Sequence, residues 1–311
     1  MEKLYLGTDL GGTTVLSGVV DSCGGILSRV SLPTPHGSGA IASAIAESSS
    51  RACREAGVSI SDIASLGVGV PGAVEGEAVL KACNLDMYDY PLGGYLSSIL
   101  NLPVHLENDA NCAAMGEYLS GCGRDASSLL CVTLGTGIGG GFIANGRLWR
   151  GANGCALEPG HMVIHRGGRM CACSRRGCFE AYASTAALVR GCEEYIAQYP
   201  NSICASLGGQ MDGRTVFRAI DAGDEGAKAL FDEYTQNLAC GLTNLVNLFQ
   251  PEILCIGGGI SAQGERLLSP LRRILEREDY ARFEGSKTKL VTAALGNDAG
   301  LVGAAHIEKF I

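Results

Sequence analysis

The sequence predicts an α/β protein built from two related halves. The chain has 311 residues, more than one small hydrophobic core usually organises, and this length favours two domains. A strand, a glycine-rich bend and a second strand open the chain at residues 4–21, and the same arrangement returns at residues 128–144. Stretches with the apolar spacing of helices follow these β units. We therefore expect an internal duplication, with a boundary near residues 119–128.

Composition and charge exclude several classes of function. The chain has 24 Lys and Arg against 32 Asp and Glu, a net charge of −8, and it has no basic run. A nucleic acid or an anionic membrane surface is therefore a poor partner. No apolar stretch reaches the ~18 residues that a membrane span needs. The N-terminal segment also lacks the apolar region and cleavage site of a secretory leader, so we expect a cytoplasmic protein.

In the first half, β-prone runs are joined by short turns that contain glycine, which is typical of hairpins. We expect strands at residues 4–9, 15–21, 26–32, 65–72 and 104–109. We expect a helix at residues 40–56, which are rich in Ala and Ser and carry apolar residues at helical spacing. We expect a second helix at residues 110–119, after the strand at 104–109.

The second half repeats the pattern and then becomes helical. Strands are expected at residues 128–134, 138–144 and 147–151, the last two joined by Asn145-Gly146, a strong hairpin signal. Residues 225–249 predict one long amphipathic helix. Its apolar stripe comprises Leu230, Phe231, Tyr234, Leu238, Leu242, Leu245, Val246 and Phe249. A buried strand from residue 253 runs into three glycines, and residues 299–310 predict a final helix.

Three glycine loops follow predicted strands, at residues 9–14, 135–141 and 257–259. Glycine lets backbone N–H groups approach an anion closely, and neighbouring threonine hydroxyls add donors. Two such loops on related halves could hold a polyphosphate from both sides, although each could also be a simple tight hairpin. None matches G-x-x-x-x-G-K-[ST] or the strand-to-helix G-x-G-x-x-G pattern. The sequence therefore argues against a P-loop enzyme and a Rossmann dehydrogenase.

Two aspartates stand where chemistry is expected. Asp9 ends the first strand, where a carboxylate beside bound phosphates can hold Mg²⁺, or can cap the turn instead. Asp109 stands at the carboxyl end of a strand and the start of a helix, the edge where ligand groups of α/β sheets gather. It could accept a proton from a hydroxyl that attacks a phosphoryl group. Its alternative role is a helix N-cap.

Four of the potential metal ligands lie close together in the sequence. His161, Cys171, Cys173 and Cys178 form a complete tetrahedral zinc set with no open position, which indicates a structural metal. The alternative is free thiols in a loop. A disulfide within C-x-C is disfavoured by geometry and by compartment, and we expect most of the fourteen cysteines to be reduced. Glu158 and Glu180 flank the cluster and could bind a polyol, or could be surface charges.

Together these motifs resemble the ROK family of sugar kinases and related repressors, over essentially the whole chain. The resemblance rests on DLGGTT at 9–14, ENDAN at 107–111, LGTGIGGG at 134–141, EPGH at 158–161, the cysteine block ending at Glu180, PEILCIGGGIS at 251–261 and GNDAGLVGAA at 296–305. It implies the two-domain actin-like ATPase fold, a duplicated ribonuclease H-like fold with a cleft between the domains. The implied domains are residues 1–119 plus 298–311, and the larger 120–297, which carries the zinc loop.

The resemblance implies an ATP-dependent hexose kinase of the glucokinase type, with Asp109 as the general base, Mg²⁺ beside ATP and a structural Zn²⁺. It implies a sugar site of Gly72, Asn84, Asn108, Asp109, Glu158, His161 and Glu180. It implies an ATP and Mg²⁺ site of Asp9, Gly11, Gly12, Thr13, Thr136, Gly137 and Gly258. It implies His161, Cys171, Cys173 and Cys178 as zinc ligands, so that His161 serves both zinc and sugar. It also implies a homodimer through the second domain.

Several alternatives stay open. N-acetylmannosamine, N-acetylglucosamine, allose and fructose are possible substrates in place of glucose, and a non-catalytic sugar-responsive regulator is a further possibility. Repressors of the family place a helix-turn-helix before the first strand, which here begins within the first five residues.

Two departures from the family pattern bear on the site. Ser174, followed by Arg175 and Arg176, stands where similar members usually have glycine, which puts the shape of the cysteine loop in question. Residues 85–90 replace the Leu-Pro and tryptophans common in glucokinases of the family, which puts the exact sugar in question.

Overall fold

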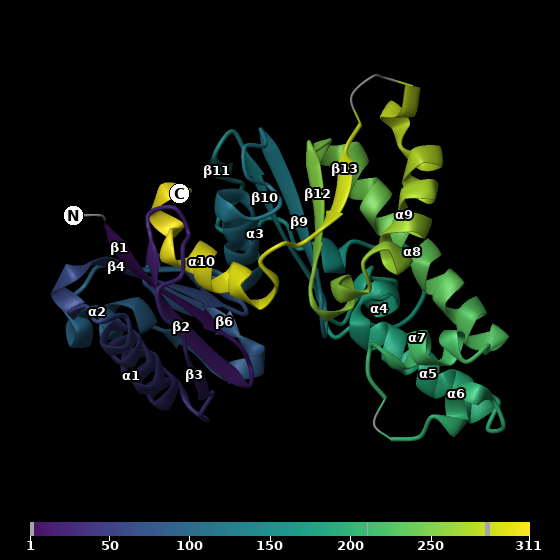
Figure 1. The fold of residues 1–311 in the computed structure, drawn as a ribbon, viewed down its shortest axis with the longest axis horizontal. Helices are drawn as coiled ribbons and strands as arrows, with labels where there is room; N and C mark the ends of the chain where they lie inside the picture. The colour runs from purple at the N-terminus through teal and green to yellow at the C-terminus, as the bar shows by residue number, and fades with distance from the viewer. Residues whose placement is uncertain (1–2, 210, 284–286) are drawn as a thin grey trace. The chain divides into compact units, whose positions relative to one another are not determined.

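The computed structural model describes residues 3–209, 211–283 and 287–311 (Figure 1). The chain divides into two compact units. Unit 1 comprises Met1–Cys131, Gly141–Leu157 and Ala293–Ile311, and unit 2 comprises Val132–Gly140 and Glu158–Thr292.

Unit 1 is organised around a five-stranded sheet in the order β3-β2-β1-β4-β8. The strands are β1 (Leu4–Leu10), β2 (Thr14–Asp21), β3 (Val30–Pro33), β4 (Ile63–Val70) and β8 (Val104–Asn108). β1, β2 and β3 form an antiparallel meander, whereas β1, β4 and β8 run parallel. β1 and β4 are mostly apolar and buried, as expected for parallel strands that are covered on both faces.

Helices cover both faces of this sheet (Figure 1). Helices α1 (Ser38–Ala56) and α2 (Leu92–Leu100) pack on the face to which Leu6 and Leu10 point. Helix α10 (Ala299–Ala305) packs on the opposite face, against Tyr5. It crosses α3 (Asp109–Ser120) with backbone in close contact, because a side chain at Gly303 would overlap the carbonyl of Cys112. A small sheet of β5 (Ala73–Glu75), β6 (Ala78–Ala82) and β7 (Met87–Tyr90) is inserted after β4.

A second five-stranded sheet has the order β11-β10-β9-β12-β13. Its strands are β9 (Ser128–Leu134), β10 (Ile138–Ala144), β11 (Arg147–Leu148), β12 (Ile253–Gly257) and β13 (Lys289–Thr292). In both sheets the first three strands are ordered third, second, first, and two later strands follow. The shared strand order confirms the internal duplication expected from the two β-glycine-β units.

The helices of unit 2 pack around α8 (Glu225–Phe249). Its bounds are those predicted, and it buries most of the predicted stripe, with Leu230 and Phe249 only half-buried. Asp224 caps its N-terminus through the backbone N–H of Ala227. The neighbouring helices are α4 (Glu180–Ala183), α5 (Thr185–Gln198), α6 (Ile203–Ser206), α7 (Thr215–Asp221) and α9 (Glu265–Glu278).

The predicted strand at residues 26–32 is largely wrong, because only Val30–Pro33 pairs as a strand. Ile26 forms an isolated bridge to Val20. Between Ile26 and the start of β3, the Ser28 hydroxyl accepts the N–H of Val19 and donates to the carbonyl of Ala52. A side chain thus takes a backbone bond that a continuous ladder would use.

The predicted helix at residues 299–310 is shorter than expected, since α10 ends at Ala305 and a separate turn, Ile307–Lys309, follows. His306 leaves the helical region with φ −119°. Its ring nitrogens lie 2.9 Å from the carbonyl oxygens of Val302 and Asp21. The side chain thereby ties the helix end to β2, and the chain turns there.

Candidate functional site

The carboxyl edge of the unit 1 sheet gathers the acidic residues predicted for catalysis. Asp9 on β1 pairs in register with Gly69 on β4, and Gly69 pairs with Glu107 on β8. Asp109 begins α3 directly after β8. Because parallel strands end at one edge, the fold brings Asp9 and Asp109 to the same edge of the sheet.

Asn108 is the N-cap of α3. Its Oδ1 accepts the backbone N–H groups of Ala110 at 2.9 Å and Asn111 at 3.2 Å, and its Nδ2 donates to the carbonyl of Gly72 at 3.2 Å. Asp109 is half-buried as the first helical residue, and its Oδ1 also accepts the Ala110 N–H at 2.9 Å. The cap position that sequence alone allowed for Asp109 therefore belongs to Asn108, and the structure joins Asn108 to Gly72.

Asp9 lies at the start of the first glycine loop. Burial raises the pKa of its carboxyl from 3.8 to about 6. The loop is closed by Gly11, whose N–H donates to Thr14 O at 2.8 Å and whose carbonyl accepts the Thr34 hydroxyl at 2.8 Å. Gly12 and Thr13 are exposed at the tip. The loop is a hairpin, and its tip presents backbone N–H groups beside a carboxylate.

Asn84 lies exposed in the turn Cys83–Leu85 that follows β6. Gly72 packs against β6 so closely that an added Cβ would lie 2.1 Å from the carbonyl oxygen of Lys81. Within the departure at residues 85–90, Met87–Tyr90 form β7, in which the Tyr88 side chain is exposed. Asp86 and Asp89 adopt positive φ values of 49° and 45°, in the left-handed region, Asp86 at the end of the turn Cys83–Leu85 and Asp89 within β7.

In unit 2 the second and third glycine loops are in contact. Gly258 has a φ of +87°, and an added Cβ would lie 2.1 Å from the carbonyl oxygen of Leu134, so only glycine fits there. A pocket of about 440 Å³ lies beside these loops. It is lined by Leu134, Gly135, Thr136, Thr185, Ala186, Val189, Arg190, Glu193 and Gly259.

Helix α5 supplies the lining residues that sequence reasoning missed, Thr185, Arg190 and Glu193. The Thr185 hydroxyl donates to Leu134 O at 3.1 Å, and the Ala186 N–H donates to Gly135 O at 3.3 Å. These bonds hold the start of α5 against the loop. The only local signal was Ser184, which caps the helix by accepting the N–H of Ala187.

His161, Cys171, Cys173 and Cys178 converge as predicted, with their ligand atoms all within 4.8 Å of one another. The Sγ of Cys171 is 3.7 Å from Nδ1 of His161, and the Sγ atoms of Cys173 and Cys178 are 3.6 Å apart. A tetrahedral zinc with its usual bond lengths separates its ligand atoms by roughly 3.5–3.8 Å. The donor set and its spacing therefore fit zinc.

Ser174 and its two arginines keep the cysteine loop closed. Ser174 adopts a φ of +69°, the left-handed region that glycine enters most easily, so a serine here takes the backbone conformation typical of glycine. Arg175 donates to the carbonyl of His161 at 3.2 Å, and Arg176 donates to that of Gly168 at 3.3 Å. This departure leaves the four ligand side chains together.

Glu180 links this cluster to the second glycine loop. Its Oε1 accepts the thiol hydrogen of Cys171 at 2.8 Å and lies 3.6 Å from Nδ1 of His161. Its other oxygen, Oε2, would lie 2.7 Å from a Cβ added at Gly137. Desolvation raises the pKa of the Glu158 carboxyl, the Glu180 charge raises it further, and His161 opposes the shift. Unit 2 thus brings Glu158, His161 and Glu180 together beside the loop.

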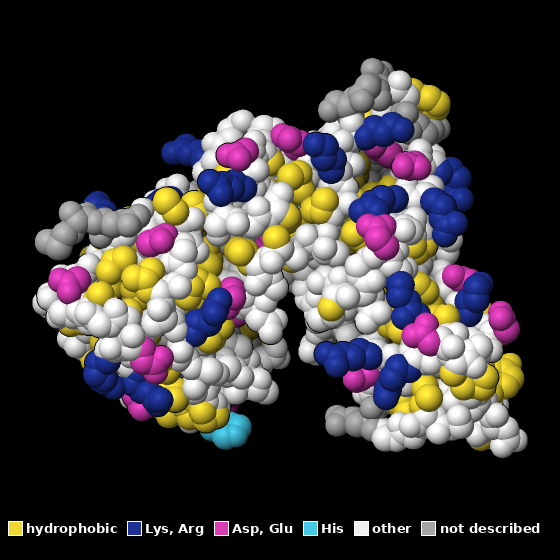
Figure 2. Space-filling model, viewed as in Figure 1, with side chains coloured by type: hydrophobic (Ala, Val, Ile, Leu, Met, Phe, Trp, Pro, Cys, Tyr) yellow, Lys and Arg dark blue, Asp and Glu magenta, His cyan; other side chains and the backbone are white. Residues whose placement is uncertain are grey.

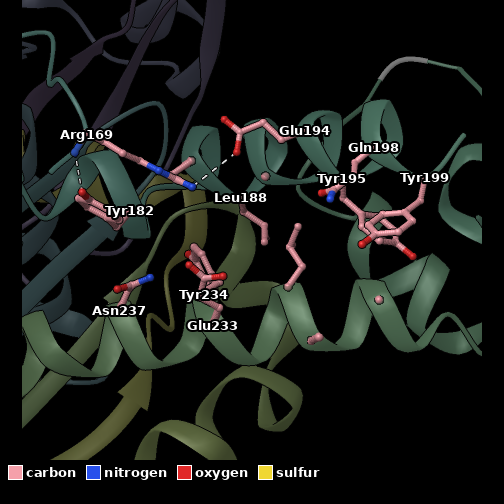
Figure 3. A pocket seen from close by; sticks show the side chains of 15 residues that line it. Arg169, Tyr182, Leu188, Glu194, Tyr195, Gln198, Tyr199, Glu233, Tyr234 and Asn237 are labelled. Carbon is pink, nitrogen blue, oxygen red and sulfur yellow. Dashed lines mark hydrogen bonds and ion pairs between the residues drawn. The ribbon is translucent and has the colours of Figure 1, made fainter.

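A second pocket of unit 2, of about 490 Å³, lies between α5 and α8, and its lining includes none of the residues predicted for the sugar, ATP or zinc sites. Figure 3 shows its tyrosines and, at one end, Arg169, whose backbone N–H donates to the Tyr182 hydroxyl and whose guanidinium pairs with Glu194. Residues on one side of α5 line this pocket, and residues on another side line the glycine-loop pocket. Helix α5 thus contributes lining residues to both pockets.

Charge on the visible face is mixed. Lys and Arg side chains are interspersed with Asp and Glu on the face that Figure 2 shows. Among the described residues, no helix combines the length and the apolarity needed to cross a bilayer.

Comparisons with known proteins identify the family. The ROK family model matches residues 5–310. A glucokinase of Halalkalibacterium halodurans is 36% identical over 99% of this chain and 96% of its own length, and a glucokinase of Streptomyces coelicolor is 38% identical over 98% of each. The crystal structure of a ROK family glucokinase from Streptomyces griseus in complex with glucose and AMPPNP has a TM-score of 0.84, with 37% identity over 98% of both chains. The two-domain actin-like ATPase fold follows, and the chain belongs to the ROK family.

Proposed function

We propose that this protein is an ATP-dependent sugar kinase that phosphorylates a hexose. The substrate we propose first is glucose, which it would convert to glucose 6-phosphate. The observation that carries the proposal is that Asp109 begins α3 at the sheet edge where Asp9 lies next to the last residue of β1. The glucokinase relatives, and the glucose and AMPPNP bound by the Streptomyces griseus enzyme, support it.

In the proposed reaction the sugar hydroxyl attacks the γ-phosphorus of ATP. Asp109 accepts the hydroxyl proton as the new O–P bond forms, and ADP leaves as the bond to its β-phosphate oxygen breaks. Positioning and charge neutralisation carry most of the catalysis in such transfers. The sugar would be held by Gly72, Asn84, Asn108, Glu158, His161 and Glu180.

The phosphates of ATP would be bound by backbone N–H groups and threonine hydroxyls of Gly11, Gly12, Thr13, Thr136, Gly137 and Gly258. The exposed tip of the first loop and the pocket beside the second support this assignment. Asp9 would hold Mg²⁺ directly or through water. Bound Mg²⁺ supplies charge neutralisation between the β- and γ-phosphates.

A structural zinc would be bound by His161, Cys171, Cys173 and Cys178. The support is a closed set of three sulfur atoms and one nitrogen at zinc-like separations. The metal would fix the loop whose flanking carboxylates, Glu158 and Glu180, face the sugar.

The decisive experiment measures ADP formation with a panel of hexoses and 2-acetamido sugars. We expect glucose to exceed N-acetylmannosamine, N-acetylglucosamine, allose and fructose in kcat/KM. A tenfold preference for a 2-acetamido sugar would overturn the choice of glucose and direct attention to residues 86–90. Absence of sugar-dependent ADP formation with every sugar would overturn the kinase assignment in favour of a sugar-responsive regulator.

The setting of the enzyme is also a proposal. Fourteen free thiols and a requirement for ATP fit the reducing cytoplasm. We propose a homodimer formed through the second domain, supported by the exposed apolar side chains of Leu248, Tyr280 and Phe283. We also propose a division into two domains, the first comprising residues 1–119 and 298–311 and the second comprising residues 120–297. Light scattering of the purified protein tests the dimer.

A further inference from the structure

An ion pair lies next to the proposed base. Glu107 is fully buried, and its Oε2 lies 2.8 Å from Nε of Arg150. The N–H does not point along this line, so the contact is an ion pair rather than a hydrogen bond, and neither atom has a hydrogen-bond partner within the described part of the chain. A buried carboxylate stays ionised only when it is paired. Arg150 therefore supplies the charge that Glu107 requires.

The other carboxylate oxygen of Glu107 accepts hydrogen bonds from residues on both sides of Asp109 in the sequence. Oε1 accepts the backbone N–H of Asn108 at 2.9 Å and the Nδ2 of Asn111 at 3.0 Å. Asn108 is the cap of α3, and Asn111 lies in its first turn. An ionised acceptor makes stronger hydrogen bonds than a neutral one. The charge on Glu107 thus fixes the backbone from which Asp109 projects.

Arg150 extends this arrangement to a second segment of unit 1. It follows β11, and its carbonyl accepts the N–H of Ala156 at 3.1 Å, which closes the loop of residues 150–156. The Arg150 side chain remains 32% exposed, so it can be changed without opening the core beneath Glu107.

We propose that Glu107 and Arg150 are positioning residues for Asp109, acting through the hydrogen bonds of Glu107 to Asn108 and Asn111. The inference rests on the proposed kinase function only in its effect on turnover. Loss of the guanidinium leaves Glu107 buried without a counter-charge, its bonds to the first turn of α3 weaken, and Asp109 leaves its productive position.

The test compares Arg150→Met, Arg150→Lys, Glu107→Gln and the double variant Glu107→Gln/Arg150→Met, with Arg147→Met at the exposed first residue of β11 as the matched control. We expect Arg150→Met to lower kcat by about 10–100-fold, the size typical of a small misplacement of a reacting group. The KM for ATP should change by less than about threefold, because the glycine loops proposed for the phosphates are untouched. Arg150→Lys keeps the positive charge, so its kcat should be at least about tenfold higher than that of Arg150→Met.

The double variant sharpens the test because it removes both charges. Its kcat should fall no more than about threefold below that of either single variant, since coupled residues are not additive. Independent effects that multiply would overturn the proposal, as would a wild-type kcat in Arg150→Met.

Hydrogen exchange keeps the inference separate from the reaction. The backbone N–H groups of Asn108, Ala110 and Asn111 should exchange at least about tenfold faster in Arg150→Met and Glu107→Gln than in Arg147→Met. Unchanged exchange overturns the positioning role whether or not the wild type is a kinase. If Arg150→Met does not fold, Glu107→Gln, which keeps the shape of the side chain, decides by the same readout.

Discussion

At the residue scale, Asn108 and Asp109 divide two roles that sequence alone could not separate. Asn108 caps α3 and holds Gly72, while Asp109 occupies the first helical position. A cap at Asn108 keeps the start of the helix intact when Asp109 is changed. Substitution of Asp109 therefore tests chemistry with little loss of local structure.

Asp109→Asn should nearly abolish turnover, because an amide cannot accept the hydroxyl proton. The expected loss in kcat is about 10²–10⁴-fold, the usual contribution of a general base. Sugar affinity should stay within a few-fold, since the side-chain shape is kept. Steady-state kinetics with equilibrium sugar binding checks this, and a variant that keeps more than about a third of the wild-type kcat would refute the base assignment.

Asp9 makes a prediction about stability against pH. Its pKa is 3.8 in an unperturbed carboxyl and about 6 in the folded protein, because burial disfavours the charge. Between these values the unfolded chain binds fewer protons than the folded one, so the contribution of Asp9 to stability falls as pH rises from about 4 to about 6. Above pH 6 the full burial cost, on the order of 1–3 kcal/mol, is present.

Asp9→Asn removes this cost. Without Mg²⁺ and ATP, the variant should gain in Tm relative to wild type as pH rises from about 4.5 to about 6.5, and the gain should then level off. Thermal unfolding at a series of pH values measures it. A difference in Tm that does not change across this range would show that Asp9 titrates normally. Mg-ATP affinity should fall in the same variant.

At the element scale, the second glycine loop packs against Glu180, the first residue of α4. Gly137 leaves room for the Glu180 carboxylate, which in turn contacts Cys171 and His161. The same loop also accepts the N–H of Ala186 from α5. The loop predicted for phosphate is therefore mechanically joined to a carboxylate predicted for sugar.

Gly137→Ala should raise the KM for sugar by about tenfold, because the added Cβ displaces a carboxylate that orients the substrate. Gly135→Ala is the matched control, since its Cβ would meet no atom within 4 Å. The sugar KM of the control should stay near that of wild type. Equal sugar KM values for the two variants would show that Glu180 moves aside without cost.

At the scale of the whole molecule, the features that sequence predicted were local ones. Glycine turns, capping residues and the stripe of α8 act over a few residues, so the β-glycine-β units and that helix were expected correctly. Contacts between distant segments were not predictable: α5 gains its role from the loop at Gly135, and Glu107 gains its counter-charge from Arg150. Ser28 interrupts the predicted strand at residues 26–32, and His306 ends the predicted helix early, for the same reason: their side-chain partners lie elsewhere in the chain.

Metal removal should separate the two units in their response. All four proposed zinc ligands belong to unit 2, so loss of zinc should loosen the loop that carries Glu158 and Glu180 and leave the β1-β4-β8 core of unit 1 protected from hydrogen exchange. Cys171→Ser or Cys178→Ser should lower zinc content and raise the sugar KM by about 10–100-fold, with little change in ATP affinity. Cys53→Ser, in α1 of unit 1, is the control and should retain one zinc per chain.

Elemental analysis of protein purified without chelator decides the matter: a zinc content near zero together with full sugar kinase activity would show that the cluster is not a metal site. His161 would then keep only its proposed contact with the sugar.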